Sequence, residues 1–245
     1  QLFIDFDGAM SNAKVWLNGE YIGEWPYGYT SFRFNLTPYI KYDQDNVLCV
    51  RLDNENNDSR WYPGAGIYRN VWLVKTNPVH IDHWGIYLTT PKITKENAMV
   101  DIQVKVKNKN LNAANVSIQT IILNPVDEKV AEAKTNSVAI ANESIHNFRF
   151  DIKVENPELW SIENPALYKA VTKVYVDEKL TDEQETIFGF RTIEFTANKG
   201  FLLNGKKVEI KGVCNHHDLG PLGAAFNTRA AERQLEILKE MGCNS

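Results

Sequence analysis

The sequence predicts a mainly β protein in three successive parts: a partial jelly-roll β-sandwich, an immunoglobulin-like β-sandwich and the first βα unit of a (β/α)8 barrel. Three observations lead to this prediction. Short segments that alternate apolar and polar residues, with the period of two that a pleated strand imposes, recur through residues 1–188. Residues 79–188 show no helical period. A polar loop followed by an amphipathic helical pattern comes only near the end, within residues 208–242.

Residues 1–78 are interpreted as the carboxy-terminal part of the jelly roll. Val15-Trp16-Leu17 leads into Asn18-Gly19, a dipeptide typical of two-residue hairpins. Residues 32–36 alternate, and the segment 47–52 is apolar enough to be expected as a largely buried strand. Short strands separated by turn signals favour a sandwich or jelly roll.

Residues 79–188 are interpreted as the immunoglobulin-like sandwich. Its clearest strand patterns cover residues 100–106, 116–123, 148–154 and 168–176. About 110 residues with roughly seven strands fit this fold. No cysteine lies in the interval, so a disulfide of the antibody type is excluded.

Residues 189–245 are interpreted as the start of the barrel. We expect a strand at 208–213 and a helix with Thr228 as its N-cap and Gly242 at its carboxyl end. The loop between them holds His216, His217 and Asp218, which is where βα units carry their functional groups. A barrel needs eight such units and about 250 residues. We therefore expect a fragment that ends just inside its catalytic domain.

Composition excludes several classes of protein. A net charge of −4 without a cluster of Lys and Arg argues against a nucleic-acid partner. No run of about 20 apolar residues is present to span a membrane. Cys49, Cys214 and Cys243 are odd in number and lack a C-x-x-C pair, which argues against a disulfide framework and a zinc site. Gln1 opens within a strand, so we expect the native amino terminus upstream, and the choice between bacterial periplasm and cytoplasm stays open.

Several motifs occur together, in an order that resembles one enzyme family. They are Asn18-Gly19, Pro26-Tyr-Gly-Tyr29, Ser59-Arg-Trp-Tyr-Pro-Gly-Ala-Gly-Ile-Tyr-Arg69, Phe188-Gly-Phe-Arg191, Leu203-Asn-Gly-Lys206 and Lys211-Gly-Val-Cys-Asn-His-His-Asp218. Together they span nearly the whole chain and resemble glycoside hydrolase family 2, with bacterial β-galactosidases as the most similar members. The resemblance implies the same order of jelly roll, immunoglobulin-like domain and (β/α)8 barrel. It also implies a retaining mechanism with two glutamates that lie on later barrel strands, so no catalytic residue is assigned here.

The resemblance also suggests residues that contact the sugar. His216 and Asp218 match the loop after the first barrel strand, with His217 between them, and Arg60 and Trp61 match a jelly-roll loop that reaches toward the site. Imidazole and carboxylate groups form directional hydrogen bonds with hydroxyls. For His216, His217 and Asp218 there are two alternatives to sugar contact. One is a metal site, although adjacent histidines point to opposite sides of an extended chain and suit a single ion poorly. The other is hydrogen bonding within their own loop. Arg60 and Trp61 would alternatively pin their own loop.

The sequence therefore predicts part of a retaining glycoside hydrolase that acts on terminal β-linked sugars, with β-galactosides favoured and no cofactor. We expect the chain itself to be inactive and its partner to be a β-linked oligosaccharide or glycoside. The truncated barrel segment is also expected to offer a surface for homo-oligomer formation. The alternatives are a β-mannosidase or β-glucuronidase of the same family, or a carbohydrate-binding or interface module without chemistry of its own.

Overall fold

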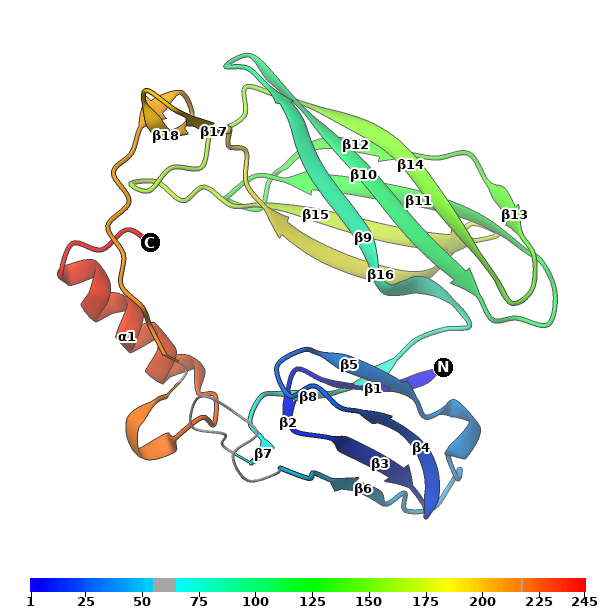
Figure 1. Ribbon diagram of the computed structural model, residues 1–245. Coiled ribbons are helices and arrows are strands. Elements are labelled where there is room, and N and C mark those ends of the chain that lie inside the picture. The colour runs from blue at the N-terminus through cyan, green and yellow to red at the C-terminus, as the bar shows by residue number, and fades with distance from the viewer. Residues whose placement is uncertain (55–64, 217) are drawn as a thin grey trace. The chain divides into compact units, whose positions relative to one another are not determined.

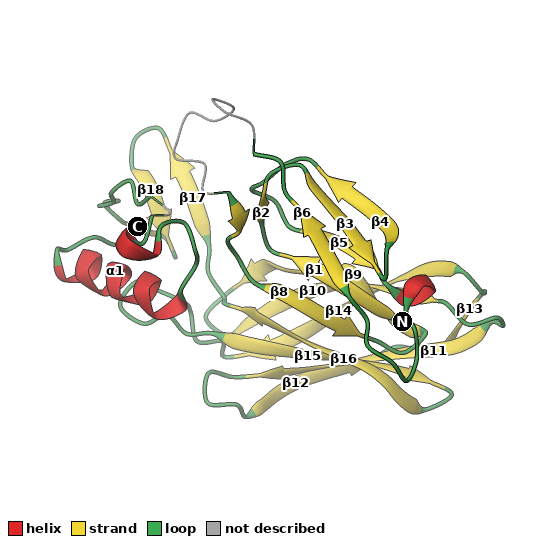
Figure 2. Cartoon of the chain, turned by 90° about the horizontal axis from the view of Figure 1, so that it is seen from below, coloured by secondary structure: helices red, strands yellow, loops and turns green. Residues whose placement is uncertain are grey.

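The computed structural model describes residues 1–54, 65–216 and 218–245, and it is mainly β, as the sequence predicts (Figures 1 and 2). The chain forms two compact units. The first combines residues 1–75 with residues 211–245, and the second comprises residues 76–210. Arg60, Trp61 and His217 lie outside the described residues.

The amino-terminal part of the first unit is a β-sandwich. One sheet has the order β5-β1-β8, the other has the order β4-β3-β6, and β2 pairs with β7. The bounds are β1 Leu2–Phe6, β2 Ala9–Met10, β3 Ala13–Leu17, β4 Glu20–Trp25, β5 Phe32–Asn35, β6 Leu48–Arg51, β7 Gly66–Ile67 and β8 Val71–Lys75, with a 3-10 turn, η1, at Thr37–Tyr39. Both sheets contribute to one core, since Ile4 and Phe6 of β1 pack in the same cluster as Val15 and Leu17 of β3.

The hairpin between β3 and β4 confirms the turn signal. Asn18 and Gly19 both have positive φ, 54° and 88°, as a type I′ turn requires. The expectation of a largely buried strand at 47–52 is wrong. Among the described strands β6 pairs with β3 alone, and Val47, just before β6, keeps 62% of its surface exposed.

The second unit contains a sandwich of two antiparallel sheets. One has the order β14-β10-β9 and the other the order β12-β11-β15-β16, with β13 also paired to β11. The bounds are β9 Val79–Ile93, β10 Asn97–Asn108, β11 Ala114–Leu123, β12 Lys129–Lys134, β13 Val138–Ile140, β14 Ser144–Glu155, β15 Tyr168–Val176 and β16 Lys179–Phe188. In β10, Val100, Ile102, Val104 and Val106 are fully buried, and every second residue between them faces outward.

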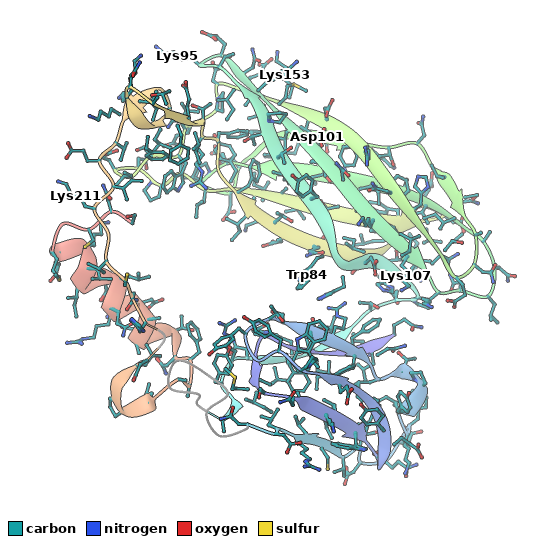
Figure 3. All side chains as sticks on the ribbon, in the orientation of Figure 1. Trp84, Lys95, Asp101, Lys107, Lys153 and Lys211 are labelled. Atoms are coloured by element: carbon teal, nitrogen blue, oxygen red, sulfur yellow. The ribbon has the colours of Figure 1, made fainter. Side chains whose placement is uncertain are left out.

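β9 contains a bulge that presents an aromatic side chain. Residues 82–85 stand opposite Lys105, between the pairs Val106–Ile81 and Val104–Ile86. Gly85 is required there, because a Cβ atom would lie 2.7 Å from the Asp82 carbonyl oxygen. Trp84 takes a φ of +50°, is 73% exposed and projects away from its sheet (Figure 3).

A small sheet completes the second unit. It has the order β17-β18-β19, with β17 Ile193–Thr196, β18 Gly200–Leu203 and β19 Lys206–Lys207. Asn204, in the predicted Asn-Gly turn, accepts a hydrogen bond from the Thr192 amide and donates one to the Trp160 carbonyl. These two bonds tie the small sheet to the loop between β14 and β15.

Residues 211–245 form a 3-10 turn, η2 Gly220–Leu222, and one helix, α1 Thr228–Glu240. The predicted strand at 208–213 is not formed. Backbone hydrogen bonds run from the Val208 amide to the Phe201 carbonyl and from residues 244–245 to the Lys211 carbonyl, and they do not make the continuous ladder that a strand needs. Asn227, rather than Thr228, is the N-cap, and its side chain accepts from the Ala230 amide at 3.0 Å. Gly242, with φ +92°, ends the helix as predicted. Among the described residues no helix is long and apolar enough to cross a membrane.

The buried Thr120–Thr172 pair allows a test of the second unit's core. Both side chains are fully buried, and their hydroxyl oxygens lie 3.0 Å apart between β11 and β15. Thr172→Val leaves the Thr120 hydroxyl without this partner, so we expect a loss of about 1–3 kcal/mol in unfolding free energy. The double variant Thr120→Val/Thr172→Val removes both polar groups and should recover most of that loss. Urea unfolding of the three variants measures this, and a double variant as unstable as the sum of both singles contradicts it.

His80 predicts a pH dependence of stability. The residue is 1% exposed, and its ring atom Nδ1 lies 2.9 Å from the Asn77 carbonyl oxygen. Burial lowers the pKa of His80 below its ordinary value, although the neighbouring carbonyls and Asp182 oppose this. Below about pH 6.5 the unfolded chain therefore takes up a proton more readily than the folded chain, so stability falls as the pH falls through that value.

We expect unfolding free energies measured at about pH 7.5 and about pH 5.5, on either side of the ordinary histidine pKa, to differ more for the wild type than for His80→Gln. Equal differences for the two proteins would contradict a neutral buried His80.

Candidate functional site

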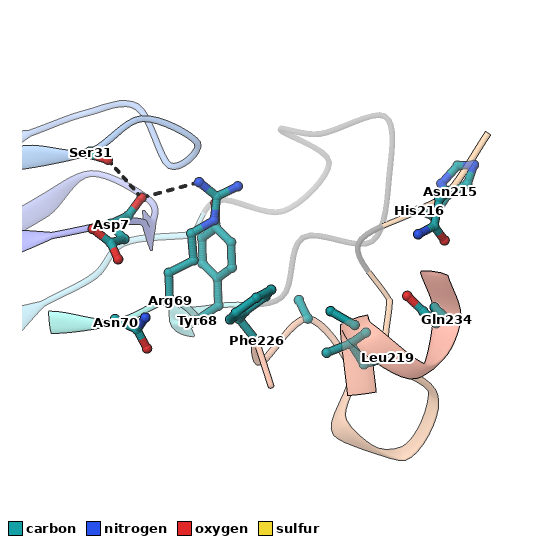
Figure 4. A pocket seen from close by; sticks show the side chains of 12 residues that line it. Asp7, Ser31, Tyr68, Arg69, Asn70, Asn215, His216, Leu219, Phe226 and Gln234 are labelled. Carbon is teal, nitrogen blue, oxygen red and sulfur yellow. Dashed lines mark hydrogen bonds between the residues drawn. The ribbon is translucent and has the colours of Figure 1, made fainter. Parts of the chain in front are cut away.

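A pocket of about 540 Å³ lies in the first unit, between the β-sandwich and the segment 211–245 (Figure 4). The sandwich contributes Asp7, Ser31, Tyr68, Arg69 and Asn70 to its lining. The other wall comprises Asn215, His216, Leu219, Ala224, Phe226, Ala231 and Gln234. The volume is within the range of about 300–1,000 Å³ that is usual for small-molecule sites.

Tyr68 and Arg69 are fixed on the sandwich side by hydrogen bonds to backbone carbonyls. The Tyr68 hydroxyl donates to the Gly28 carbonyl at 2.9 Å. The Arg69 guanidinium lies 5.1 Å from the centre of the Tyr68 ring and donates to the carbonyls of Asp7 and Tyr29 at 3.3 and 3.4 Å. Gly8 allows this close approach, since a Cβ atom there would lie 2.9 Å from the Tyr68 hydroxyl.

On the sandwich wall, Tyr68 acts as a hydrogen-bond donor and Asp7 as an acceptor. Burial raises the pKa of Tyr68, and the Arg69 cation opposes that shift only in part. Tyr68 therefore stays protonated and donates near neutral pH. The Asp7 carboxylate accepts a hydrogen bond from the Trp72 indole at 3.0 Å, and the Asp7 carbonyl accepts from Ser31.

The second wall is joined to the first by a backbone hydrogen bond. The Phe226 amide donates to the Tyr68 carbonyl at 2.8 Å. Within the second wall, Leu219 donates to the Gly223 carbonyl, and the Gln234 side chain donates to the Asp218 carbonyl at 3.3 Å. Asn215 and His216 face Tyr68 and Arg69 from across the pocket (Figure 4).

Of the five residues that the sequence predicts to contact the sugar, the structure describes His216 and Asp218. His216 is exposed and lines the pocket. Asp218 is exposed and outside the lining, and its carboxylate accepts from the Gly220 amide at 2.8 Å. His217, Arg60 and Trp61 lie outside the described residues. The sugar-binding role of all five stays a prediction.

Sequence reasoning did not select Asp7, Arg69, Phe226 or Gln234. Arg69 ends a motif that the resemblance used, so a basic residue at the end of a loop motif was an available signal. Asp7 and Gln234 had no such signal, because a strand-end aspartate and a helix-face glutamine are common on any surface.

The lining offers both polar groups and apolar surface to a ligand. Amide, guanidinium and imidazole groups supply donors, Asp7 supplies a carboxylate acceptor, and Phe226 with Leu219 supplies apolar surface. Within the described part of the chain, no three His, Cys, Asp or Glu side chains are grouped so that they could hold a metal ion. Hydrogen bonds and apolar contact are what the described lining offers a ligand.

The fold and the pocket describe β-sandwiches with a polar cavity, and comparison with known proteins identifies the family. Residues 79–191 match the family model described as glycosyl hydrolases family 2. A β-galactosidase named BoGH2A from Bacteroides ovatus is 47% identical over 98% of this chain, which spans 28% of that relative. A putative β-glucuronidase from Formosa agariphila is 39% identical over 99% of this chain, which spans 23% of it.

Solved structures agree with these relatives. A glycosyl hydrolase family 2 member from Bacteroides cellulosilyticus superposes with a TM-score of 0.94 at 38% identity, covering 99% of this chain and 31% of that one. A Bacteroides uniformis β-glucuronidase gives 0.91 at 30% identity, covering 99% of this chain and 30% of that one. The chain belongs to glycoside hydrolase family 2. It spans less than a third of the length of these relatives.

Proposed function

We propose that this chain is part of a retaining glycoside hydrolase that removes terminal β-linked sugars, with β-galactosides as the favoured substrates. The 47% identity to the Bacteroides ovatus β-galactosidase over nearly the whole chain carries this proposal. Relatives named as β-glucuronidases are 39% identical or less, so we rank glucuronides second.

The pocket at Arg69 and His216 is proposed to contact the sugar. Its donors and acceptors come from both walls, and a pyranose carries hydroxyls around its ring that need both. Phe226 offers an aromatic ring for the apolar C–H face of the sugar.

The catalytic carboxylates are proposed to lie outside this chain. Retaining glycosidases use two carboxyl groups about 5–5.5 Å apart. Asp7 is the one carboxylate among the described lining residues, and it accepts a hydrogen bond from Trp72. The described lining therefore supports binding, and the reaction itself is assigned to the complete barrel of the whole protein.

Two alternatives have support in specific observations. A binding module without catalysis is consistent with a pocket that has one described carboxylate. A β-glucuronidase is consistent with the second relative and with Arg69, whose guanidinium could pair with a uronic acid carboxylate. A β-mannosidase has no comparable support in the relatives named here.

Binding tests the role of His216. In the 245-residue chain, His216→Ala should weaken binding of methyl β-D-galactopyranoside about three- to tenfold, because one hydrogen bond to the ligand is lost. His146→Ala is the matched control, since the same substitution is made in β14 of the second unit, outside this lining. Calorimetric titration of both variants measures this. An equal loss in both variants would contradict the specific role of His216, and tighter binding of the matching β-glucuronide would favour the second substrate.

Turnover tests where the catalytic groups lie. The 245-residue chain should not hydrolyse an aryl β-galactoside, whereas the full-length protein should, since losing a nucleophile or its acid partner removes most of the rate enhancement. Release of the nitrophenolate chromophore from a nitrophenyl β-galactoside measures both. Activity that stays with the purified 245-residue chain, or a full-length protein with no activity on any β-glycoside, would contradict the proposal.

A further inference from the structure

A second pocket in the first unit lies among residues to which the proposed function gives no role. It measures about 320 Å³ and is lined by Asn12, Lys14, Glu24, Trp25, Pro26 and Asp53. These residues come from the β2–β3 connection, β3, the end of β4 and the segment after β6. None of them lines the pocket at Arg69 and His216.

Lys14 and Glu24 carry opposite charges and lie side by side in the strand pairing, but they form no ion pair with each other. They are register partners in the β3–β4 ladder. Cross-strand partners of opposite charge commonly pair, as Lys173 and Glu183 do at 3.3 Å in the second unit. Among the described residues, however, Lys14 makes no ion pair or hydrogen bond, and Glu24 accepts only from the Tyr21 hydroxyl at 3.1 Å. A donor and an acceptor are therefore both available at this pocket.

The remaining lining is held in place by other contacts. Asn12, with φ +47°, donates through its side chain to the Asp53 carbonyl at 3.1 Å, and its amide donates to the Pro26 carbonyl. Arg51 holds one Asp53 carboxylate oxygen at 3.0 Å. The Trp25 indole donates to Thr30, and its ring stacks 6.0 Å from Phe32.

This lining combines features that select a polyhydroxylated, uncharged ligand. A simple anion would meet Glu24 and Asp53, and a simple cation would meet Lys14, so either sign of charge is opposed. A sugar hydroxyl both donates and accepts, so neighbouring hydroxyls can bridge an ammonium and a carboxylate. Trp25 and Pro26 offer apolar surface at the same place. The volume lies near the lower end of the range for small-molecule sites, which fits one or two sugar rings.

We propose that the pocket formed by Lys14, Glu24, Asn12 and Asp53 is a second saccharide-binding site, separate from the pocket at Arg69 and His216. The ligand class rests on the proposed function, and the site would hold a neutral sugar unit of a glycan without acting on it.

The test uses the 245-residue chain and two neutral saccharides, lactose and cellotetraose, in amide-detected NMR titrations. Saccharide should shift the backbone amides of Asn12, Glu24 and Trp25 together with the Trp25 indole signal. Lys14→Met/Glu24→Gln removes both charges at similar size and should weaken this binding at least about tenfold, because two charge-assisted hydrogen bonds are lost. The matched control Lys173→Met/Glu183→Gln removes an exposed cross-strand pair elsewhere and should bind as the wild type does. Glu24→Gln alone provides a milder variant should the double variant unfold.

His216→Ala separates the two pockets. Shifts at Trp25 that persist in His216→Ala and disappear in Lys14→Met/Glu24→Gln support the second site. If His216→Ala abolishes all saccharide binding while Lys14→Met/Glu24→Gln leaves it unchanged, the second site is overturned and the proposed function stands. Shifts at Trp25 that are absent with both saccharides also overturn the second site, whereas the proposed function is judged separately by turnover of the full-length protein.

Discussion

A backbone hydrogen bond from the Phe226 amide to the Tyr68 carbonyl joins the two described walls of the pocket at Arg69 and His216. Tyr68 and Phe226 are about 160 residues apart in the sequence, and this bond joins the connection before β8 to the segment that leads into α1. Tyr68 is itself fixed by its hydroxyl bond to Gly28 and by Arg69 over its ring. Tyr68 therefore contacts both walls of the pocket. These contacts bring side chains from distant segments of the chain to one cavity.

The strands of the second unit could be predicted from the sequence because local pattern and tertiary packing agree there. β10 alternates without interruption, each inward residue is fully buried, and both of its neighbours are long antiparallel strands. The Asn-Gly turns were equally readable, since both positions need positive φ and these residues tolerate it. The β15–β16 turn could not be predicted in this way, because Asp177 and Glu178 take positive φ values of 46° and 66° and no glycine marks the turn in the sequence.

The exposure of β6, the conformation of residues 208–213 and the lining of the pocket could be predicted from the sequence only in part. Val47 and Leu48 are as apolar as buried residues, and nothing in their pattern reveals that β6 pairs with only one of the other described strands. The segment 208–213 has the alternation of a strand, yet alternation describes side chains and a strand also requires partner carbonyls and amides. His216 was selected because its predicted loop type is a common location for functional groups, and it lines the cavity, while its role stays a prediction. Asp7 and Gln234 reach the same cavity only through the fold.

The two walls of that pocket are stabilised in different ways. The sandwich wall continues into a buried core that contains Phe6 and Phe32. The other wall includes α1, which buries no residue and leaves Leu235 61% exposed. Polar contacts order this wall: the Asn227 cap, the bonds of Gly242 and Cys243 to the last helical turn, and the exchange between Asn244 and Lys211. Polar contacts at exposed positions contribute about 1 kcal/mol each. In this chain the sandwich wall is therefore held mainly by its apolar core, whereas the wall that includes α1 is held mainly by polar contacts.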